Sequence, residues 1–430
     1  MNSFVLQNVA LASGEITDIK VVDGTIEAIG KSLTAETVLD CTNLIALPGF
    51  VDLHTHLREP GYEASETVLT GSQSAALGGF TAVHAMANTN PVADTAGVVE
   101  QVFSLGREAG LVDVYPIGAV TVGLEGKQLA ELGAMANSRA QVRVFSDDGK
   151  CVSDPLLMRR ALEYVKTFGG VIAQHAQDPR LTEGAQMNAG PVSAELGLAG
   201  WPAVAEESII ARDVLLAEHV GSRIHICHLS TKGSVEIIRW AKSRGISVTT
   251  EVTPHHLLLT DEMARTYNAI YKVNPPLRTE ADVLALREAL VDGTIDIIAT
   301  DHAPHPIEAK DCEWSAAAPG MVGLEIAQSV AQLVLIDSGK SNWERLSQVL
   351  SSKPAAIAGD SDHGAITVGA PANIAIINPA ATRTIQAATA SKSLNNPYAD
   401  RILPGEVVHT IYRGRFTVLN GALQKKEELA

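Results

Sequence analysis

The sequence predicts an α/β protein in which residues 48–360 form a parallel (β/α)8 TIM-type barrel, and residues 1–47 and 361–430 form a small β-sandwich domain. Three observations predict this fold. A chain of 430 residues is longer than one small hydrophobic core can accommodate. Its middle alternates apolar runs with segments of helical spacing. Both of its ends consist instead of short apolar runs broken by Gly, Asp and Pro.

The first segment, residues 4–45, predicts a small antiparallel sheet. Alternating apolar positions flank Asp23-Gly24, a pair that is typical of a two-residue hairpin turn. The chain is therefore expected to begin with paired strands rather than with a strand and helix unit.

The middle of the chain predicts eight strands. The first is the apolar run that starts at Phe50, and seven more follow at 80–86, 113–120, 141–148, 170–176, 223–229, 246–252 and 294–302. Between them lie Ala- and Glu-rich stretches with helical spacing, such as 155–168, 206–219 and 281–290. Eight strand and helix units in succession predict a closed parallel barrel.

The last segment, beyond residue 360, returns to short strands with Pro and Gly turns, at 364–366, 372–377 and 407–419. This pattern of short apolar runs and turn residues is similar to that of the opening segment. Our hypothesis is that both ends of the chain form one β-sandwich beside the barrel.

Composition narrows the function. A net charge of −16 and a pI near 5.3 argue against nucleic acid or an anionic membrane as partner. No signal peptide and no apolar run long enough to span a bilayer is found, so a cytoplasmic enzyme is expected. The cysteines form no Cys-x-x-Cys pair and are expected to be reduced thiols: Cys41, Cys151, Cys227 and Cys312.

The stretch 48–61, PGFVDLHTHLREPG, ends an apolar strand in His54 and His56. Side chains two residues apart in a strand point to the same side, so both imidazoles face one way at its C-terminal end. One rigid element can hold a metal ion with two nitrogens in this manner. Arg58 adds a donor suited to a carboxylate or phosphate.

Other metal-binding side chains also follow predicted strands. The C-terminal ends of barrel strands gather on one rim, where they would converge. Two divalent ions sharing a carboxylate and a hydroxide fit the set His54, His56, Asp147, Asp148, His175, His228 and Asp301. We interpret His84, His219, His225, His363 and His409 as structural. The role of His255 and His256 stays open, and they are left out of the metal set.

Several motifs together resemble the amidohydrolase superfamily and, within it, the bacterial dihydroorotases of the long-chain class. They are PGFVDLHTHLREPG, MANTNPV (86–92), FSDDGK (145–150), QHAQD (174–178), ICHLST (226–231), VTPHHL (252–257), VNPPLR (273–278) and ATDHAPH (299–305). The resemblance implies reversible cyclisation of N-carbamoyl-L-aspartate to (S)-dihydroorotate, a step of pyrimidine biosynthesis.

The resemblance also implies site residues. His54, His56 and Asp301 would hold one Zn²⁺ and His175 and His228 a second, with Asp148 and a hydroxide as bridges. Asp301 would be the general acid and base. The substrate would contact His56, Arg58, Asn88, Asn274, His305 and the backbone at Pro319 and Gly320, where Pro319 replaces the family's usual aromatic residue.

Alternatives remain open at this point. Many relatives bridge the metals with a carboxylated lysine, and Lys150 is the rival to Asp148. The segment 302–320 is either a lid or a long surface loop. The chain could be another cyclic amidohydrolase, of allantoinase or dihydropyrimidinase type, or a non-catalytic scaffold for aspartate transcarbamoylase. That enzyme or a second copy of the chain is a possible partner.

Overall fold

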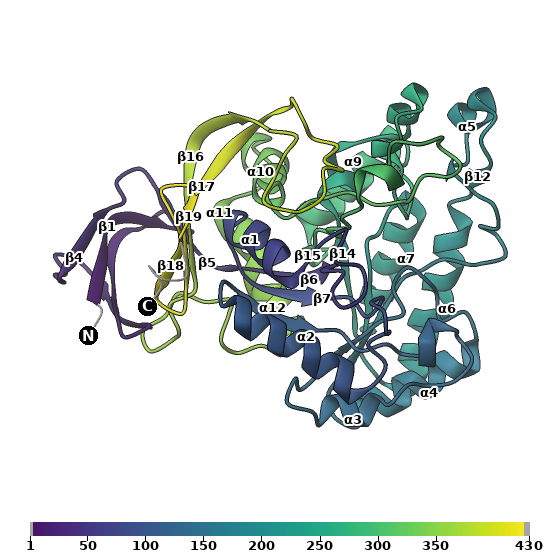
Figure 1. Cartoon of the computed structure of the whole chain (residues 1–430), viewed down its shortest axis with the longest axis horizontal. Coiled ribbons are helices and arrows are strands. Elements are labelled where there is room, and N and C mark those ends of the chain that lie inside the picture. Colours follow the sequence, from purple (N-terminus) through teal and green to yellow (C-terminus); the bar gives the residue numbers. More distant parts are fainter. Residues whose placement is uncertain (1–2, 425–430) are drawn as a thin grey trace.

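The computed structural model describes residues 3–424 and has an α/β architecture (Figure 1). Two parallel sheets form its centre. One contains β6 (Phe50–Thr55), β7 (Phe80–Ala85) and β8 (Asp113–Pro116). The other contains β9 (Val144–Phe145), β10 (Val171–Gln174), β13 (Ile224–Ile226), β14 (Val248–Val252) and β15 (Ile297–Ile298).

Single parallel bridges join these two sheets at both ends. Gly118 pairs with Phe145 beside β8 and β9, and Thr55 pairs with His302 beside β6 and β15. The strands therefore follow one another in chain order around a closed ring. All eight predicted strands are present, although every strand with a predicted range is shorter than predicted, and β9 and β15 have two residues each.

Small and branched side chains fill the inside of the ring, among them Val51, Leu53, Ala82, Ile117 and Val171, all nearly inaccessible to solvent. Such a packed interior leaves no pore, so a ligand must bind at one of the two open ends. We call the end formed by the C-terminal ends of the strands the rim, and the opposite end the lower mouth.

Helices cover the outside of the ring and connect its strands. The longer ones are α1 (Val68–Leu77), α2 (Ala96–Ala109), α4 (Pro155–Lys166), α6 (Val204–Val220), α7 (Lys232–Ser243) and α9 (Glu280–Asp292). The shorter ones are α3 (Leu132–Ala136), α5 (Pro191–Leu196), α8 (Pro254–Leu258), α10 (Ala327–Gln332), α11 (Trp343–Ser347) and α12 (Lys353–Ala358). A short pair, β11 (Met187–Asn188) and β12 (Gly200–Trp201), lies between β10 and α6.

Local signals explain where the predicted helices begin and end. Asp154 caps α4 by accepting a hydrogen bond from the Leu157 amide, and a proline occupies the first turn. Thr279 and Asp282 form a capping box at α9, which ends at Gly293 in a left-handed conformation.

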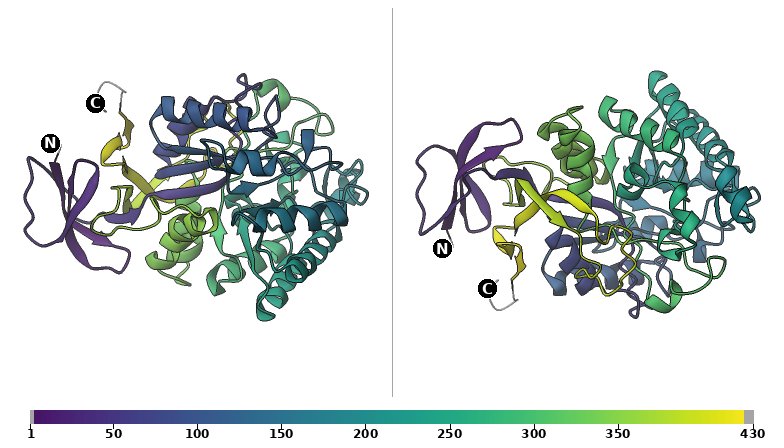
Figure 2. Two further views of the ribbon diagram at one scale, coloured as in Figure 1. Left: turned by 90° about the horizontal axis from the view of Figure 1, so that it is seen from below. Right: turned by 90° about the horizontal axis from the view of Figure 1, so that it is seen from above.

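Both ends of the chain share one nine-stranded sheet, the terminal sheet (Figure 2). Its strands are β1 (Ser3–Leu11), β2 (Ile16–Val22), β3 (Thr25–Gly30), β4 (Thr37–Asp40), β5 (Ile45–Pro48), β16 (Ile374–Thr384), β17 (Ile402–Tyr412), β18 (Arg415–Leu419) and β19 (Ala422–Leu423). β5 pairs with β16, so the two ends of the chain meet in the middle of the sheet. The predicted hairpin at Asp23-Gly24 is confirmed.

One predicted strand is wrong, because residues 364–366 form no strand. This segment is fixed by side chains instead of by a ladder. His363 contacts the Asp360 carboxylate at 2.8 Å and the Thr81 carbonyl at 3.2 Å, and Gly364 has a positive φ of 93°. Its apolar residue, Ile366, still packs against the core of the terminal sheet.

The chain between β16 and β17, residues 385–401, leaves the terminal sheet and reaches the rim of the ring (Figure 1). We call this segment the arm. Among residues 3–424, no helix is both long and apolar enough to cross a membrane.

Candidate active site

Asp148 is the centre of the polar cluster on the rim. Its Oδ1 atom lies 3.1 Å from Nδ1 of His175, 3.3 Å from Nε2 of His228 and 3.4 Å from Nε2 of His54. Its Oδ2 atom lies 3.3 Å from Nε2 of His56. All five side chains are buried. One carboxylate therefore faces four imidazoles that come from three different strand ends.

A second carboxylate completes one side of this cluster. Oδ1 of Asp301 lies 3.0 Å from Nε2 of His56 and 3.4 Å from Nε2 of His54. Two sets of atoms spaced for an ion result, and they share Asp148: one contains His54 and His56, and the other contains His175 and His228. The structure thus brings together the predicted metal residues.

Hydrogen bonds on the far side of each ring set its orientation. Nδ1 of His54 lies 2.6 Å from a Glu251 oxygen, and Nδ1 of His56 lies 3.0 Å from the Asn88 side-chain oxygen. Each Nδ1 therefore carries a proton that it donates outward. The Nε2 atom of each ring is left with a lone pair directed at the cluster.

His175 is oriented in the same way with its two nitrogens exchanged. Its Nε2 atom lies 2.7 Å from Oε1 of Gln177, so Nδ1 faces inward, 2.9 Å from Nε2 of His228. Two imidazole nitrogens that face each other this closely beside a carboxylate are an arrangement suited to a shared cation.

The cluster carries a surplus of negative charge around His54. Burial alone lowers the pKa of His54, but the carboxylates of Asp148, Glu251 and Asp301 raise that pKa well above its ordinary value. Within residues 3–424, Nε2 of His54 is buried without a hydrogen-bond partner. A divalent cation would satisfy both this orphaned nitrogen and the surplus charge, so the residues fit a pair of metal ions.

Sequence reasoning missed Glu251 at the end of β14. One of its oxygens accepts from His54 and from the His228 amide at 3.2 Å, and the other lies 3.0 Å from Nε2 of His225. Burial alone raises the pKa of Glu251, but His54 and His225 hold it below its usual range. His225, interpreted as structural, thus supports a carboxylate that orients the predicted metal ligand His54. The position of Glu251 at a strand end was the available signal.

The two candidate bridges beside Asp148 do not face the cluster. Asp147 accepts hydrogen bonds from the amides of Val120 and Thr121 at 2.8 and 3.0 Å, so its carboxylate holds the neighbouring loop. Lys150 is exposed to solvent. Asp148 is therefore the carboxylate that the geometry favours as the bridge.

The residues expected to bind a substrate carboxylate lie beside the cluster of histidines and aspartates. Nη2 of Arg58 is 3.4 Å from Nε2 of His305, and Nε of Arg58 donates to the Pro304 carbonyl at 3.2 Å. Burial lowers the pKa of Arg58 to about 10, which leaves it charged at neutral pH. Burial and the neighbouring Arg58 lower the pKa of His305 to about 3, so its ring is neutral.

Gly320 and Pro319 lie against this pair. Nε2 of His305 donates to the Pro319 carbonyl at 2.9 Å. Gly320 has a φ of 154°, and a Cβ atom there would lie 2.7 Å from the His305 ring. The close approach of the backbone therefore requires glycine.

Asn274 lies on the other side of the cluster. Its Nδ2 atom donates to Oε1 of Gln177 at 3.2 Å, and its Oδ1 atom is buried without a partner among the described residues. His256 is held by Thr253 at 2.8 Å and by the Pro275 carbonyl at 3.2 Å. The sequence left the role of His256 open, and these contacts indicate that its side chain stabilises the loop.

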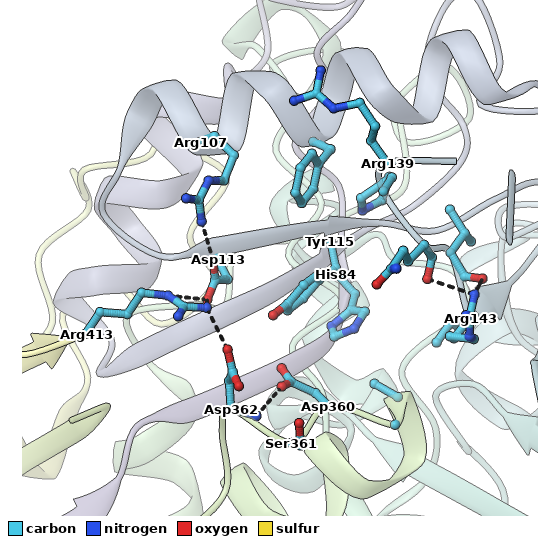
Figure 3. Close-up of a pocket in the computed structure, with 18 residues that line it drawn as sticks. His84, Arg107, Asp113, Tyr115, Arg139, Arg143, Asp360, Ser361, Asp362 and Arg413 are labelled. Carbon is cyan, nitrogen blue, oxygen red and sulfur yellow. Dashed lines mark hydrogen bonds and ion pairs between the residues drawn. The ribbon is translucent and has the colours of Figure 1, made fainter. Parts of the chain in front are cut away.

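A different cavity, of about 410 Å³, lies at the lower mouth (Figure 3). Arg413 contacts Asp113 at 2.8 Å and Asp362 at 3.0 Å, and the Tyr412 hydroxyl donates to Asp113 at 2.8 Å. These contacts join the terminal sheet to the start of β8. Arg413 thus pairs with two carboxylates at this cavity, whereas the carboxylates of the rim face histidines.

Comparison with known proteins agrees with this geometry. A family model described as dihydro-orotase-like matches residues 43–234. A dihydroorotase from Leifsonia xyli subsp. xyli is 66% identical over 425 residues, which cover 98% of this chain and 97% of that protein. A dihydroorotase from Streptomyces coelicolor is 64% identical over 428 residues, which cover 98% and 100%.

Among solved structures, the L-hydantoinase of Arthrobacter aurescens matches with a TM-score of 0.89 and 25% identity, over 99% of this chain and 98% of that one. The likeness extends over the ring and the terminal sheet alike. On this evidence the chain belongs to the dihydroorotase family of cyclic amidohydrolases.

Proposed function

We propose that this protein is a dihydroorotase that interconverts N-carbamoyl-L-aspartate and (S)-dihydroorotate with loss or gain of water, in pyrimidine biosynthesis. The observation that carries the proposal is the joint presence of a shared carboxylate among four histidines and an arginine beside it. The relatives of 64% and 66% identity are dihydroorotases, which supports the same reaction.

We propose that the site holds two Zn²⁺ ions. His54, His56 and Asp301 would hold one, His175 and His228 the other, and Asp148 both. Imidazole and carboxylate donors suit zinc. When bound, the two ions would lower the pKa of water and polarise the ring amide carbonyl.

Asp301 moves the proton in this proposal. Burial alone raises the pKa of Asp301, but His54 and His56 hold it below its usual range, so its carboxylate is ionised and can accept a proton. In the hydrolytic direction it accepts a proton from the attacking water and donates it to the departing ring nitrogen. Cyclisation uses the same group in reverse.

The substrate carboxylate would bind at Arg58, Asn88 and His305. The guanidinium supplies two parallel charge-assisted donors, which explains a half-buried cation in a chain of net charge −16. Asn88 both orients His56 and lies beside the metal cluster. Asn274 and the backbone at Gly320 would bind the ring, since the orphaned Oδ1 of Asn274 is a free acceptor.

Turnover of dihydroorotate by the purified, zinc-loaded chain, followed by ultraviolet absorbance, tests the proposal. The expected result is hydrolysis of dihydroorotate, with a kcat that Asp301→Asn lowers by about 10³-fold. Hydrolysis of allantoin or dihydrouracil without turnover of dihydroorotate would instead support the rival cyclic amidohydrolases. Absence of any turnover with zinc bound would favour a non-catalytic scaffold.

We propose the domain division 48–360 for a catalytic (β/α)8 barrel, and 1–47 with 361–430 for a β-sandwich. The closed order of the ring strands and the separate apolar core of the terminal sheet support it. A cytoplasmic location and an association with aspartate transcarbamoylase or a second copy of the chain are further proposals. Sedimentation of the protein with and without the transcarbamoylase tests the association.

A further inference from the structure

The arm brings buried polar side chains of the C-terminal segment to the rim. Ser391 and Lys392 contact the Glu66 carboxylate, the latter through its amide at 3.1 Å, and Ser393 donates to the Ser65 carbonyl at 2.6 Å. The segment that these contacts hold, residues 56–66, carries Arg58. A strand pair of the terminal sheet therefore supports one of the loops around the active site.

Asn395, further along the arm, contacts the other loop. Its side chain is 3% exposed and uses both its oxygen and its nitrogen. Oδ1 accepts from the His305 amide at 3.1 Å, and Nδ2 donates to the Ala303 carbonyl at 2.9 Å and the Gly320 carbonyl at 3.0 Å. The backbone carbonyl of Asn395 accepts from the Val322 amide at 3.1 Å.

These bonds join the two ends of the segment 302–320. His305 lies near its start and Gly320 at its end, and the backbone there is tightly packed: a Cβ atom on Gly320 would lie 2.8 Å from the Ala303 carbonyl oxygen. A side chain that fixes Ala303, His305 and Gly320 together fixes the distance between the His305 ring and the Gly320 backbone.

We propose that Asn395 is a positioning residue that holds His305 and Gly320 in place for the substrate. The inference rests on the proposed function, in which those two residues bind dihydroorotate. The arm reaches both the Arg58 loop, through Glu66, and the His305 loop, through Asn395. The terminal sheet thereby contributes to substrate binding without supplying a group that touches the substrate.

The hydrogen bonds made by Asn395 require a side-chain carboxamide. An asparagine offers one acceptor and two donors in one plane, which match one amide and two carbonyls. An aspartate of the same size keeps the acceptor but turns an oxygen toward the carbonyls of Ala303 and Gly320. Such a buried oxygen without a donor is unfavourable and pushes the two loop ends apart.

Asn396 provides a matched control. It is 1% exposed and lies on the same arm, but among residues 3–424 its side chain bonds only within the arm. Its Nδ2 atom donates to the Gln386 carbonyl at 2.9 Å, and its Oδ1 atom accepts from the Tyr398 amide at 3.0 Å. Loss of the Asn396 side chain should disturb the arm about as much as loss of the Asn395 side chain, but it should not release His305 or Gly320.

The experiment compares Asn395→Ala, Asn395→Asp and Asn396→Ala in the zinc-loaded full chain. For both Asn395 variants we expect KM for dihydroorotate to rise about tenfold or more, with a smaller change in kcat and unchanged zinc content. Hydrogen exchange in residues 302–320 should become faster in these variants. In Asn396→Ala, KM should stay within about twofold of wild type.

An unchanged KM in Asn395→Asp, or an equal rise in Asn396→Ala, would overturn the inference. Asn395→Asp preserves the size of the side chain and so keeps the test usable if Asn395→Ala does not fold. The same experiment separates this inference from the proposed function. A wild-type chain that does not turn over dihydroorotate contradicts the function. An active wild type whose KM equals that of Asn395→Asp contradicts only the role of Asn395.

Discussion

The two ends of the strand ring differ in whether their buried polar atoms have partners. At the rim, Nε2 of His54 and Oδ1 of Asn274 are buried without partners among the described residues. Left-handed backbone occurs at both ends, with φ of 63° at Arg58 and 45° at Asp301 on the rim and 49° at Arg413 at the lower mouth, so it does not distinguish them. At the lower mouth, Arg413 and Asp113 pair with each other.

This contrast separates function from stability within one fold. Buried polar atoms without partners cost free energy, and a chain retains them where a ligand will later make the missing contacts. Paired charges at the lower mouth need no ligand. Substitutions at the rim should therefore reduce activity with little effect on stability, and substitutions at the lower mouth should do the reverse.

The largest effect is expected from Asp301→Asn. Loss of the proton acceptor should lower kcat by about 10³-fold, within the roughly 10²- to 10⁴-fold range of general acid and base groups. The free energy of unfolding of the metal-free chain should fall only slightly, by about 1 kcal/mol or less, because asparagine keeps an oxygen that can accept from His56 although it loses the charge that His54 and His56 favour. A kcat within tenfold of wild type, or a large loss of stability, would remove the contrast between the two ends.

Arg58→Lys should have the next largest effect. It replaces a planar pair of donors by one ammonium group, and the lost charge-assisted hydrogen bond, worth about 1.5–3 kcal/mol, should raise KM roughly 10- to 100-fold. Zinc content, measured by atomic emission, should stay as in wild type. If KM were unchanged, Arg58 would not bind the substrate carboxylate.

The matching test at the lower mouth is Asp113→Asn. Asp113 is buried and accepts from Tyr412 and Arg413, so its neutralisation should lower the free energy of unfolding by about 2–3 kcal/mol. Denaturant unfolding measures this loss, and kcat/KM at 25 °C should stay within about twofold. A loss of activity in the folded variant would contradict the structural role.

The smallest effect concerns acid stability. Burial alone raises the pKa of Asp360, but the hydrogen bond and charge of His363 lower it to about 2. A lowered carboxyl pKa stabilises the fold above the unfolded value, near 3.9, and this stability is lost as pH falls from about 4 to 2.

Between these pH values the loss should be about 1–2 kcal/mol, after allowance for partial exposure of the pair. His363→Gln should lose less stability over the same range, as measured by urea unfolding at each pH. Parallel curves for the two proteins would show that this pair does not contribute.

Periodicity and turn residues predicted the framework of the fold. The eight ring strands, the Asp23-Gly24 hairpin and the helices α4, α6 and α9 follow from local patterns. The predicted strand at 364–366 is wrong because long-range contacts of His363 decide that segment, and no local pattern reports them.

The residues of the site divide in the same way, into those that a local sequence pattern indicates and those that it does not. His54, His56, Asp148, His175 and Asp301 could be found because they follow predicted strands, and strand ends converge in a parallel ring. Glu251 and Asn395 act through other residues, and their partners lie far away in sequence. Glu251 is 197 residues from His54, and Asn395 is 90 residues from His305. Such contacts become visible only after the chain is folded.

The central claim is that Asp148 joins two metal positions. Counting zinc ions per chain in wild type, Asp148→Ala and Lys150→Ala, together with the intact mass of each protein, tests it most directly. The account predicts two ions in wild type and in an active Lys150→Ala, no added carboxyl mass, and loss of zinc and activity in Asp148→Ala. Full zinc binding by Asp148→Ala would contradict it. Loss of zinc from Lys150→Ala, together with the mass of a carboxylated lysine in wild type, would contradict it as well.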